Sequence, residues 1–329
     1  MGFSWRSVGI ATAAAVVAGC ATILGIDDGI PRDAATDAAI VTNDASDTDA
    51  PDASADAPTE AAPTTCDVDA SFDPPIAFST LDSTANDAHL RLSSNELVGF
   101  FESSRDGGTG GYDVYSATRA TIGDTWTGVT LVSAVDSTGN DEDPSLSGDS
   151  LALYMQRGAE LYRATRGTPT ATFAAPVALA ATHGAGTDFA PYVIESGNDL
   201  YFASTRNDVD AGVASLFVTQ PLGDGGFTPV AAVSGTALTT GDNRYAAVTP
   251  DDLVLYFASS RAGGQGGFDI WVSTRASTSA AFGAPRVVAE VSSTKDEFPD
   301  WISSDRCRLY FTSDRGTGDD NVFVASKTP

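Results

Sequence analysis

Short apolar runs separated by turn residues recur along this chain as one repeated strand–turn–strand pattern. The clearest copies begin at Asp87 (DAHLRLSSNELVGFFESSRDGGTGGYDVYSATR) and at Asp242 (DNRYAAVTPDDLVLYFASSRAGGQGGFDIWVSTR), and weaker copies begin near Asp143, Asp188 and Asp296. One arginine occupies the same place in every copy, at separations of 52, 49, 55 and 54 residues: Arg105, Arg157, Arg206, Arg261 and Arg315. A period of about 40 to 55 residues with several short strands per copy is typical of a β-propeller.

Each copy predicts four strands. The innermost is short and follows a proline, as at Ser145–Ser147, Tyr192–Ile194 and Trp301–Ser303. The second is an apolar run rich in Tyr, Phe, Val and Leu, such as 253–258, and it leads into Ser-x-Arg and a glycine-rich turn. The third strand follows that turn: Val114–Ala117, Leu161–Ala164, Leu216–Val218, Ile270–Val272 and Val322–Ala325.

A fourth, outer strand begins with an aromatic residue and usually a proline, which is tolerated at a strand start or on an edge. Phe173–Pro176, Phe227–Pro229 and Phe282–Pro285 carry this signature. The last copy lacks it, but Phe72–Pro75 supplies one before the first copy, so the segment near Ile76–Phe78 is predicted to complete the last blade. That pairing removes an open sheet edge. The sequence therefore predicts an all-β, five-bladed β-propeller closed by an N-terminal outer strand.

The end of the repeat resembles a known family. The sequences GYDVY at 111–115 and GFDIW at 267–271, after Ser-x-Arg and Gly-Gly, resemble the TolB-type WD-like β-propeller repeat. The resemblance covers about residues 72–329, and the second and third copies depart from it in their turns. It implies a propeller that binds other molecules in the cell envelope.

The N-terminus is predicted to be an export and anchoring segment. Arg6 precedes an apolar stretch, Val8–Ala18, which is too short for a membrane span. The following Gly19 and Cys20 resemble the lipobox of bacterial lipoproteins, which implies cleavage after Gly19 and lipid on Cys20. The alternative is an ordinary secretory signal with an incidental cysteine.

Three segments follow from this interpretation. Residues 1–19 are the lipoprotein signal peptide, residues 20–65 are a lipidated Asp/Ala/Thr/Pro-rich disordered linker, and residues 66–329 are the propeller. The expected localisation is the bacterial cell envelope, attached through lipid to the outer membrane. The protein is expected to be a monomer.

The net charge limits the kinds of molecule that the protein can bind. The chain carries −26, from 18 basic and 44 acidic residues. This excludes nucleic acid as a partner and disfavours direct attraction to anionic lipid, since both carry the same sign. The charge is typical of an acidic exported surface, and the alternative is the capture of a cation or a basic ligand.

Cys66 and Cys307 remain as a pair once Cys20 is assigned to lipid. Disulfides form and persist in exported proteins, so a Cys66–Cys307 disulfide is predicted to staple the ring closure. The alternative is two buried free thiols. No Cys-x-x-Cys or Cys/His cluster indicates a metal, and no cofactor is expected.

Each copy also carries an aspartate before the inner strand and an arginine after the second strand. We expect both in loops on one face, as a structural Asp–Arg buckle that fixes the turn. The alternative is a charged binding rim. The predicted pairs are Asp87–Arg105, Asp143–Arg157, Asp188–Arg206, Asp242–Arg261 and Asp296–Arg315.

Catalytic chemistry is poorly represented. The two histidines, His89 and His183, are expected in corresponding regions between strands of different blades, and no Gly-x-Ser-x-Gly motif occurs. The loop 314–321 has oxygen ligands suited to calcium, but an ordinary turn is the simpler interpretation. No catalytic residue is predicted, and the chain is not expected to be an enzyme.

The predicted function is a membrane-tethered scaffold that binds a protein or glycan in the envelope. The alternative is a propeller glycoside hydrolase with carboxylates in the central channel. Converging Glu and Asp with raised pKa values favour the hydrolase, and a funnel lined by Ser and Thr favours the scaffold.

Overall fold

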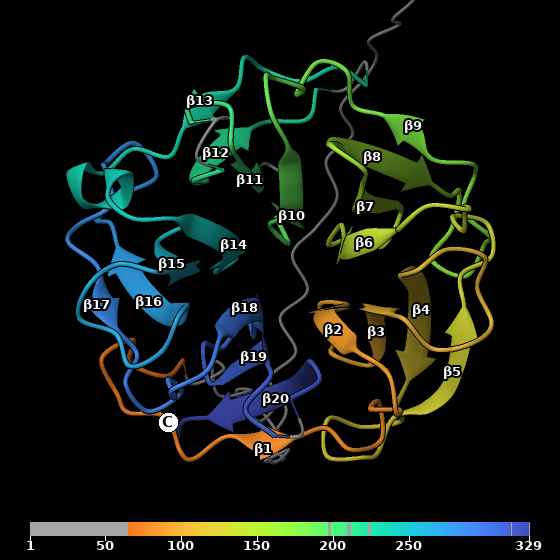
Figure 1. Ribbon diagram of the computed structural model, residues 1–329, viewed down its shortest axis with the longest axis horizontal. Coiled ribbons are helices and arrows are strands. Elements are labelled where there is room, and N and C mark those ends of the chain that lie inside the picture. Colours follow the sequence, from red (N-terminus) through yellow and green to blue (C-terminus); the bar gives the residue numbers. More distant parts are fainter. Residues whose placement is uncertain (1–64, 197–198, 209–211, 223–224, 317, 329) are drawn as a thin grey trace, which may run out of the picture. The chain divides into compact units, whose positions relative to one another are not determined.

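Five four-stranded antiparallel sheets form a β-propeller (Figure 1). The computed structural model describes residues 65–196, 199–208, 212–222, 225–316 and 318–328. The predicted signal peptide, Cys20 and all of the predicted linker except Thr65 lie outside these residues. Within them, no helix is long and apolar enough to cross a membrane.

The first three blades follow the chain order from the inner strand to the outer strand (Figure 1). Blade 1 contains β2 (Asp87–Leu92), β3 (Val98–Ser103), β4 (Asp113–Thr118) and β5 (Thr127–Leu131). Blade 2 contains β6 (Glu142–Leu146), β7 (Ala152–Arg157), β8 (Glu160–Thr165) and β9 (Val177–Ala178). Blade 3 contains β10 (Asp188–Val193), β11 (Leu200–Ser204), β12 (Ser215–Thr219) and β13 (Ala231–Ala232).

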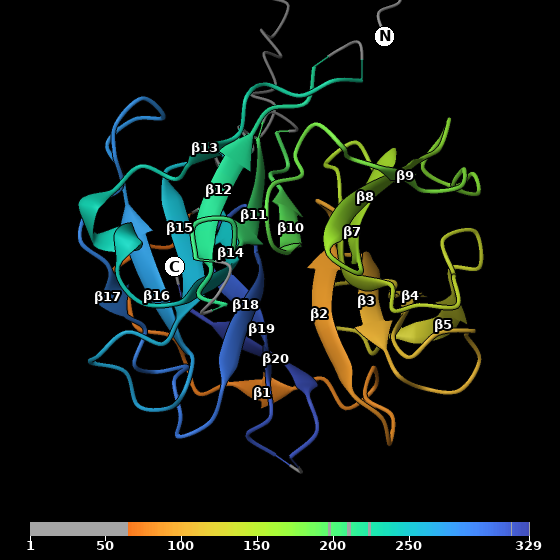
Figure 2. The ribbon, with the colours of Figure 1, turned by 45° about the horizontal axis from the view of Figure 1, so that its top comes forward.

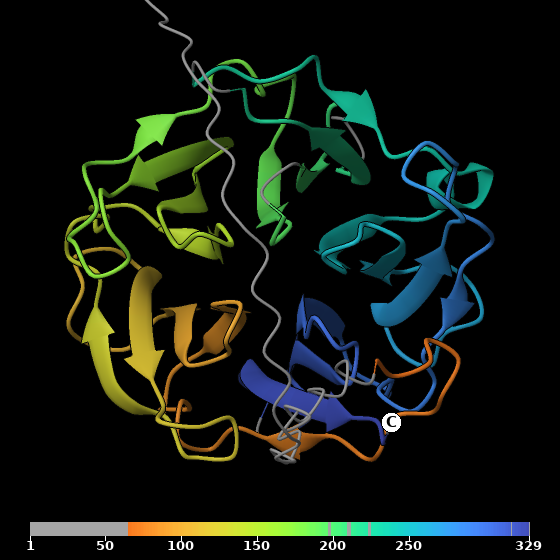
Figure 3. The same cartoon turned by 180° about the vertical axis from the view of Figure 1, so that it is seen from behind.

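The last two blades complete the ring, which is seen from behind in Figure 3. A 3₁₀ helix, Thr236–Thr239, precedes blade 4. Blade 4 contains β14 (Asn243–Val248), β15 (Val254–Ser259), β16 (Asp269–Thr274) and β17 (Arg286–Val287). Blade 5 contains β18 (Glu297–Ile302), β19 (Arg308–Ser313), β20 (Asn321–Ser326) and β1 (Ile76–Ala77), which comes from the start of the described chain.

The apolar second and third strands of the blades form the core. All six residues of β15 are buried, and Phe101, Phe202 and Phe311 are fully buried on the equivalent strands of other blades. These runs are rich in aromatic and β-branched residues because both faces of each sheet pack against neighbouring blades. The tilted view in Figure 2 shows that the strands run from one face of the ring to the other.

The inner strands are longer than the sequence predicted. β6, β10 and β18 begin three or four residues before the predicted starts and include the prolines that the prediction placed ahead of the strands. A register shift falls at or next to each proline: between Glu142 and Ser145, between Phe189 and Tyr192, and between Pro299 and Trp301. A bulge leaves a backbone group unpaired, and it therefore accommodates a residue that has no N–H to donate.

The outer strands begin later in the chain than the sequence predicted. β9 and β17 follow the aromatic–proline signature and do not contain it. The aromatic residue instead lies buried beside the sheet, as Phe173 and Phe282 do. The signature therefore marks the entry to the outer strand.

The chain ends meet in blade 5, as the sequence predicted. β1 pairs antiparallel with β20, with Ile76 opposite Val324 and Ala77 opposite Phe323. Figure 1 shows β1, from the start of the described chain, beside β20, from its end. Two backbone hydrogen bonds outside the ladder extend the contact, from Phe78 N to Val322 O (2.8 Å) and from Asp73 N to Ser326 O (2.7 Å).

A cation over an aromatic ring repeats in four blades and shows that the N-terminal segment occupies the place of an ordinary outer strand. Arg119 lies over Trp126 (4.5 Å), Arg166 over Phe173 (4.3 Å) and Arg275 over Phe282 (4.4 Å). In blade 5 the cation is Lys327 and the ring is Phe72, at 4.3 Å. The aromatic residue that opens the outer strand thus has the same neighbour in blade 5, although it comes from the opposite end of the chain.

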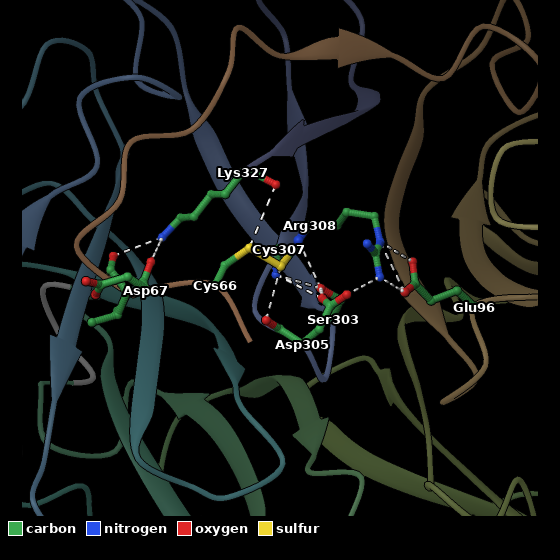
Figure 4. Close-up of a disulfide and its surroundings, with 9 residues drawn as sticks. Cys66, Asp67, Glu96, Ser303, Asp305, Cys307, Arg308 and Lys327 are labelled. Carbon is green, nitrogen blue, oxygen red and sulfur yellow. Dashed lines mark hydrogen bonds and ion pairs between the residues drawn. A yellow bond between two sulfur atoms is a disulfide. The ribbon is translucent and has the colours of Figure 1, made fainter. Parts of the chain in front are cut away.

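A disulfide joins Cys66 to Cys307, with Cα atoms 5.2 Å apart, and fixes this closure (Figure 4). Cys307 lies in the turn between β18 and β19, and the backbone N–H of Cys66 donates to Asp305 O (2.8 Å). The Lys327 ammonium donates to the carbonyl oxygens of Asp67 and Val68 (Figure 4). The inner hairpin turn and the entry to the outer strand therefore lie on the same side of the blade.

Candidate functional site

A pocket of about 310 Å³ opens where the inner strands of several blades converge. Its lining combines carboxylates, an amide, a guanidinium group and two aromatic rings from blades 1 to 4: Glu102, Glu142, Asp143, Gln156, Phe189, Thr205, Arg244 and Tyr245. Pockets with a few convergent polar groups are the usual places for ligand binding in an uncharacterised fold.

The bulge in each inner strand supplies part of this site. His89, Asp143, Ala190 and Tyr245 hold equivalent positions, two residues after the partner of the repeated arginine, and all have φ between 49° and 55°. In blade 5 the position is Pro299. Three of these bulge residues meet, since the His89 ring stacks on Tyr245 (4.3 Å, 11°) and lies 3.7 Å from Asp143. Non-glycine residues adopt positive φ rarely, and such backbone is concentrated at functional sites.

His89 lies among three buried carboxylates. Its Nδ1 is 3.3 Å from Asp300 Oδ1, and its Nε2 is 3.9 Å from Glu102 Oε1 and 3.7 Å from Asp143 Oδ1. The second oxygens of these carboxylates are held by other groups. Glu102 Oε2 accepts from Asp143 N (2.6 Å), Asp143 Oδ2 accepts from Ala190 N (2.9 Å) and Asp300 Oδ2 accepts from Thr312 Oγ1 (2.9 Å).

Burial and mutual charge shift the protonation of this cluster. Burial raises the pKa of Glu102 and of Asp143, while the neighbouring His89 acts in the opposite direction. Burial alone would lower the pKa of His89, but the charges of Glu102, Asp143 and Asp300 together raise it above the ordinary value. Several ionisable groups with shifted pKa values therefore lie at the centre of the ring, which is common at functional sites.

Two of the predicted Asp–Arg pairs form as expected. Arg105 pairs with Asp87 (2.5 Å) and Arg206 pairs with Asp188 (2.8 Å). Each guanidinium also donates to a carbonyl in the loop that enters its blade, Leu81 O and Thr182 O respectively. The pair therefore connects the end of the second strand to the preceding crossover loop.

The other three predicted partners are wrong, although their arginines have the same role. Arg157 pairs with Asp141 (2.6 Å), not Asp143, and Arg315 pairs with Glu297 (3.0 Å), not Asp296. Arg261 donates to Asn243 Oδ1 (2.7 Å).

The displaced acids have other partners. Asp242 pairs with Arg244, and Asp296 accepts from the Phe268 backbone N–H. Asp143 belongs to the central pocket. In every blade the arginine's partner is the residue that opens the inner strand or the residue just before it. The three wrong partners are acids one or two residues away, whose side chains point elsewhere.

The remaining sequence candidates lie apart from the pocket lining. His183 is in the crossover before β10, not at the position equivalent to His89, and its half-exposed ring is 3.5 Å from Asp188 and 3.8 Å from Glu160. Asp314, in the loop considered for calcium, pairs with Lys295 (3.0 Å).

Replacing Arg261 with alanine is expected to lower the free energy of unfolding by about 1–3 kcal/mol, because Asn243 and Ser259 lose a charged donor. Chemical denaturation followed by tryptophan fluorescence measures this loss. Lys295→Ala, which removes an exposed ion pair, is the matched control and should cost less than about 1 kcal/mol. Unchanged stability with loss of ligand binding would support the charged-rim alternative.

The chain matches no protein-family profile, and no curated protein is significantly similar to it in sequence. Solved structures share its fold. TolB from Acinetobacter baumannii is 12% identical with a TM-score of 0.50, and the match covers 76% of this chain and 56% of TolB.

Two further structures match over most of their length. BT0996, solved as an RGII complex, is 10% identical with a TM-score of 0.51, covering 79% of this chain and 92% of BT0996. CoXyl43, a GH43 β-xylosidase/α-arabinofuranosidase from a compost microbial metagenome in complex with xylotriose, is 12% identical with a TM-score of 0.50, covering 78% of this chain and 94% of CoXyl43. At these identities the likeness concerns the fold alone.

Proposed function

We propose that this protein is a ligand-binding β-propeller that recognises a glycan in the central pocket. The observation that carries the proposal is the lining of that pocket. Saccharides present hydroxyl groups that both donate and accept, and the pocket offers acceptors in Glu142 and Asp143 and donors in Arg244 and Gln156. The rings of Phe189 and Tyr245 supply the apolar surface that most ligand pockets contain.

Of the two predicted classes of ligand, a protein is less favoured than a glycan. Stable protein interfaces bury about 800 Å² on each partner around a largely apolar centre. Among the described residues, the exposed large hydrophobic side chains come from separate segments: Ile76, Ile122, Val177 and Leu222. A small polar pocket fits a short saccharide better than a protein surface.

Glycan-array binding followed by calorimetry with the purified protein tests this proposal. Gln156→Ala and Glu142→Gln are each expected to weaken binding at least tenfold, about 1.4 kcal/mol, since each removes a polar partner from the pocket. Gln220→Ala, on another part of the propeller, is the matched control and should bind normally. Envelope proteins captured equally by wild type and variants, with no saccharide bound, would count against the glycan and for a protein ligand.

A glycoside hydrolase remains the second candidate because buried carboxylates with raised pKa values converge in the pocket, which is the feature expected of such an enzyme. Their spacing argues against it. The facing ligand atoms of Glu102, Asp143 and His89 lie within 4.8 Å of one another, closer than the carboxyl separations of about 5–5.5 Å in retaining and 6.5–9.5 Å in inverting enzymes. Release of reducing sugar from a bound oligosaccharide, abolished by Glu102→Gln, would establish the hydrolase.

We also propose that lipid on Cys20 tethers the propeller to the outer membrane. The apolar segment before Cys20 and the Asp/Ala/Thr/Pro-rich segment that begins a few residues after it support this proposal. Cys20→Ser is expected to leave the protein unprocessed or soluble and unlabelled by radioactive palmitate. Thr22→Ser is the matched control and should be processed normally. Membrane fractionation and full palmitate labelling of the Cys20 variant would refute the anchor.

A further inference from the structure

The His89 cluster has a geometry that its hydrogen bonds do not explain. Nε2 of His89 faces Glu102 Oε1 at 3.9 Å and Asp143 Oδ1 at 3.7 Å. Both distances are too long for a hydrogen bond. Two ligand atoms that each lie about 2.0–2.4 Å from one ion, at an angle near 110°, are about 3.3–3.9 Å apart. Both distances from Nε2 lie in this range, and the facing oxygens of Glu102 and Asp143 lie within 4.8 Å of each other, so the three atoms are close enough to contact one ion.

The second polar atom of each side chain is already fixed. Glu102 and Asp143 each accept a backbone N–H with the oxygen that faces away from His89. His89 Nδ1 lies beside Asp300 Oδ1, and an ionised carboxylate only accepts, so Nδ1 carries a proton. Nε2 faces the gap, and a metal ion bound there replaces the proton that Nε2 carries in the imidazolium form. A carboxylate behind the far nitrogen of a histidine is the usual support for a metal-ligating imidazole.

The charges around the gap are consistent with a divalent cation. Glu102, Asp143 and Asp300 are buried carboxylates. Arg91, 2% exposed, interacts electrostatically with Asp143 and Asp300, and its guanidinium nitrogens have no hydrogen-bond partner among the described residues. Metal ligation requires a neutral imidazole and ionised carboxylates, and in that state Arg91 offsets only one of the three buried negative charges. A divalent ion supplies the two missing positive charges.

We propose that His89, Glu102 and Asp143 form a binding site for a divalent transition-metal ion of the Zn²⁺ type. Calcium and magnesium prefer all-oxygen sites, whereas imidazole suits Zn²⁺, Cu²⁺, Fe²⁺ and Ni²⁺. Three protein ligands leave a fourth position for water or for a ligand oxygen. Glu102 and Asp143 also line the central pocket, so that position is reached from the pocket. The proposal does not rest on glycan binding.

Calorimetry with Zn²⁺ on the chelator-treated full chain tests the site, in millimolar Ca²⁺ and Mg²⁺ to saturate exposed carboxylates. Wild type is expected to bind one Zn²⁺ at this site more tightly than at any other site on the chain. His89→Ala should weaken that event by on the order of 100-fold or more. His183→Ala is the matched control, because His183 also lies between two carboxylates but is half-exposed. It should leave the binding unchanged.

Co²⁺ absorption provides a second readout that a purely structural histidine would not affect. Wild type is expected to give visible bands of a low-symmetry Co²⁺ site, and Zn²⁺ should displace them. Asp300→Asn keeps a partner for the imidazole but removes the supporting charge, and should weaken binding about 10–100-fold. If His89→Ala fails to fold, Asp300→Asn and Glu102→Gln decide the matter. Wild-type protein without tight Zn²⁺, or with Zn²⁺ bound equally by these variants, overturns the proposal.

Discussion

Removing the Cys66–Cys307 disulfide is expected to lower the free energy of unfolding by about 2–5 kcal/mol. The cysteines are 241 residues apart, so the cross-link restricts nearly the whole unfolded propeller. It also holds a closing strand, β1, of only two residues. We expect Cys66→Ser/Cys307→Ser, made in a Cys20→Ser background, to unfold at lower denaturant concentration and to be cut earlier by protease near Asp69–Phe78.

Two controls separate the covalent link from the packing of its neighbours. Reduction of the parent protein should reproduce the loss, because it opens the same bond without changing a side chain. Lys327→Met keeps the disulfide and the contact with Phe72 but removes the donors to Asp67 and Val68. It should destabilise less than the double serine variant. Equal stability of the reduced and oxidised parent would show that the closure does not depend on the bond.

The blade number and the closure were predictable because all five blades repeat the same strand pattern. In blades 1, 2, 4 and 5, an aromatic residue ahead of the outer strand packs under a cation that follows the third strand. Phe72 carries that signature at the wrong end of the chain, and it lies at 4.3 Å from Lys327. Local sequence therefore predicted that the two ends of the propeller share one blade, since the two parts of that blade are recognisable separately.

The inner strands were harder to predict because a bulge interrupts their alternation. Two acidic residues compete for the arginine in blades 2 and 5, Asp141 with Asp143 and Asp296 with Glu297. In blade 4 the partner is not acidic, since Asn243 accepts from Arg261. A shift of one residue reverses the direction of a side chain in a strand, and spacing alone does not fix the register to that accuracy.

The central pocket was missed for a different reason. Its residues differ between blades, whereas a repeat pattern reveals only the residues that the blades share. The bulge position holds His89, Asp143 and Tyr245 in blades 1, 2 and 4, and these three meet at the centre. The signal in the sequence is the varied chemistry at this one position, which also holds Ala190 in blade 3 and Pro299 in blade 5.

Asp87→Ala is expected to have the second large effect, a loss of about 3–5 kcal/mol of unfolding free energy. Asp87 is fully buried and opens β2. It accepts from the Ser83 backbone N–H and hydroxyl, from the Ser103 hydroxyl and from Arg105. Alanine leaves all four donors without this acceptor and leaves the partly buried charge of Arg105 unpaired.

Asp87→Asn is the matched control, because blade 4 contains the same substitution naturally. Asn243 accepts from Arg261 and Ser259 through Oδ1, and its Nδ2 donates to the carbonyl of Leu238. Asparagine at residue 87 keeps an acceptor for Arg105 and Ser103 but loses the charge and faces the Ser83 N–H with a donor. We therefore expect Asp87→Asn to cost about 1–3 kcal/mol, between wild type and alanine. Equal losses for the two variants in thermal and urea unfolding would mean that the charge, rather than the hydrogen bonds, holds this turn.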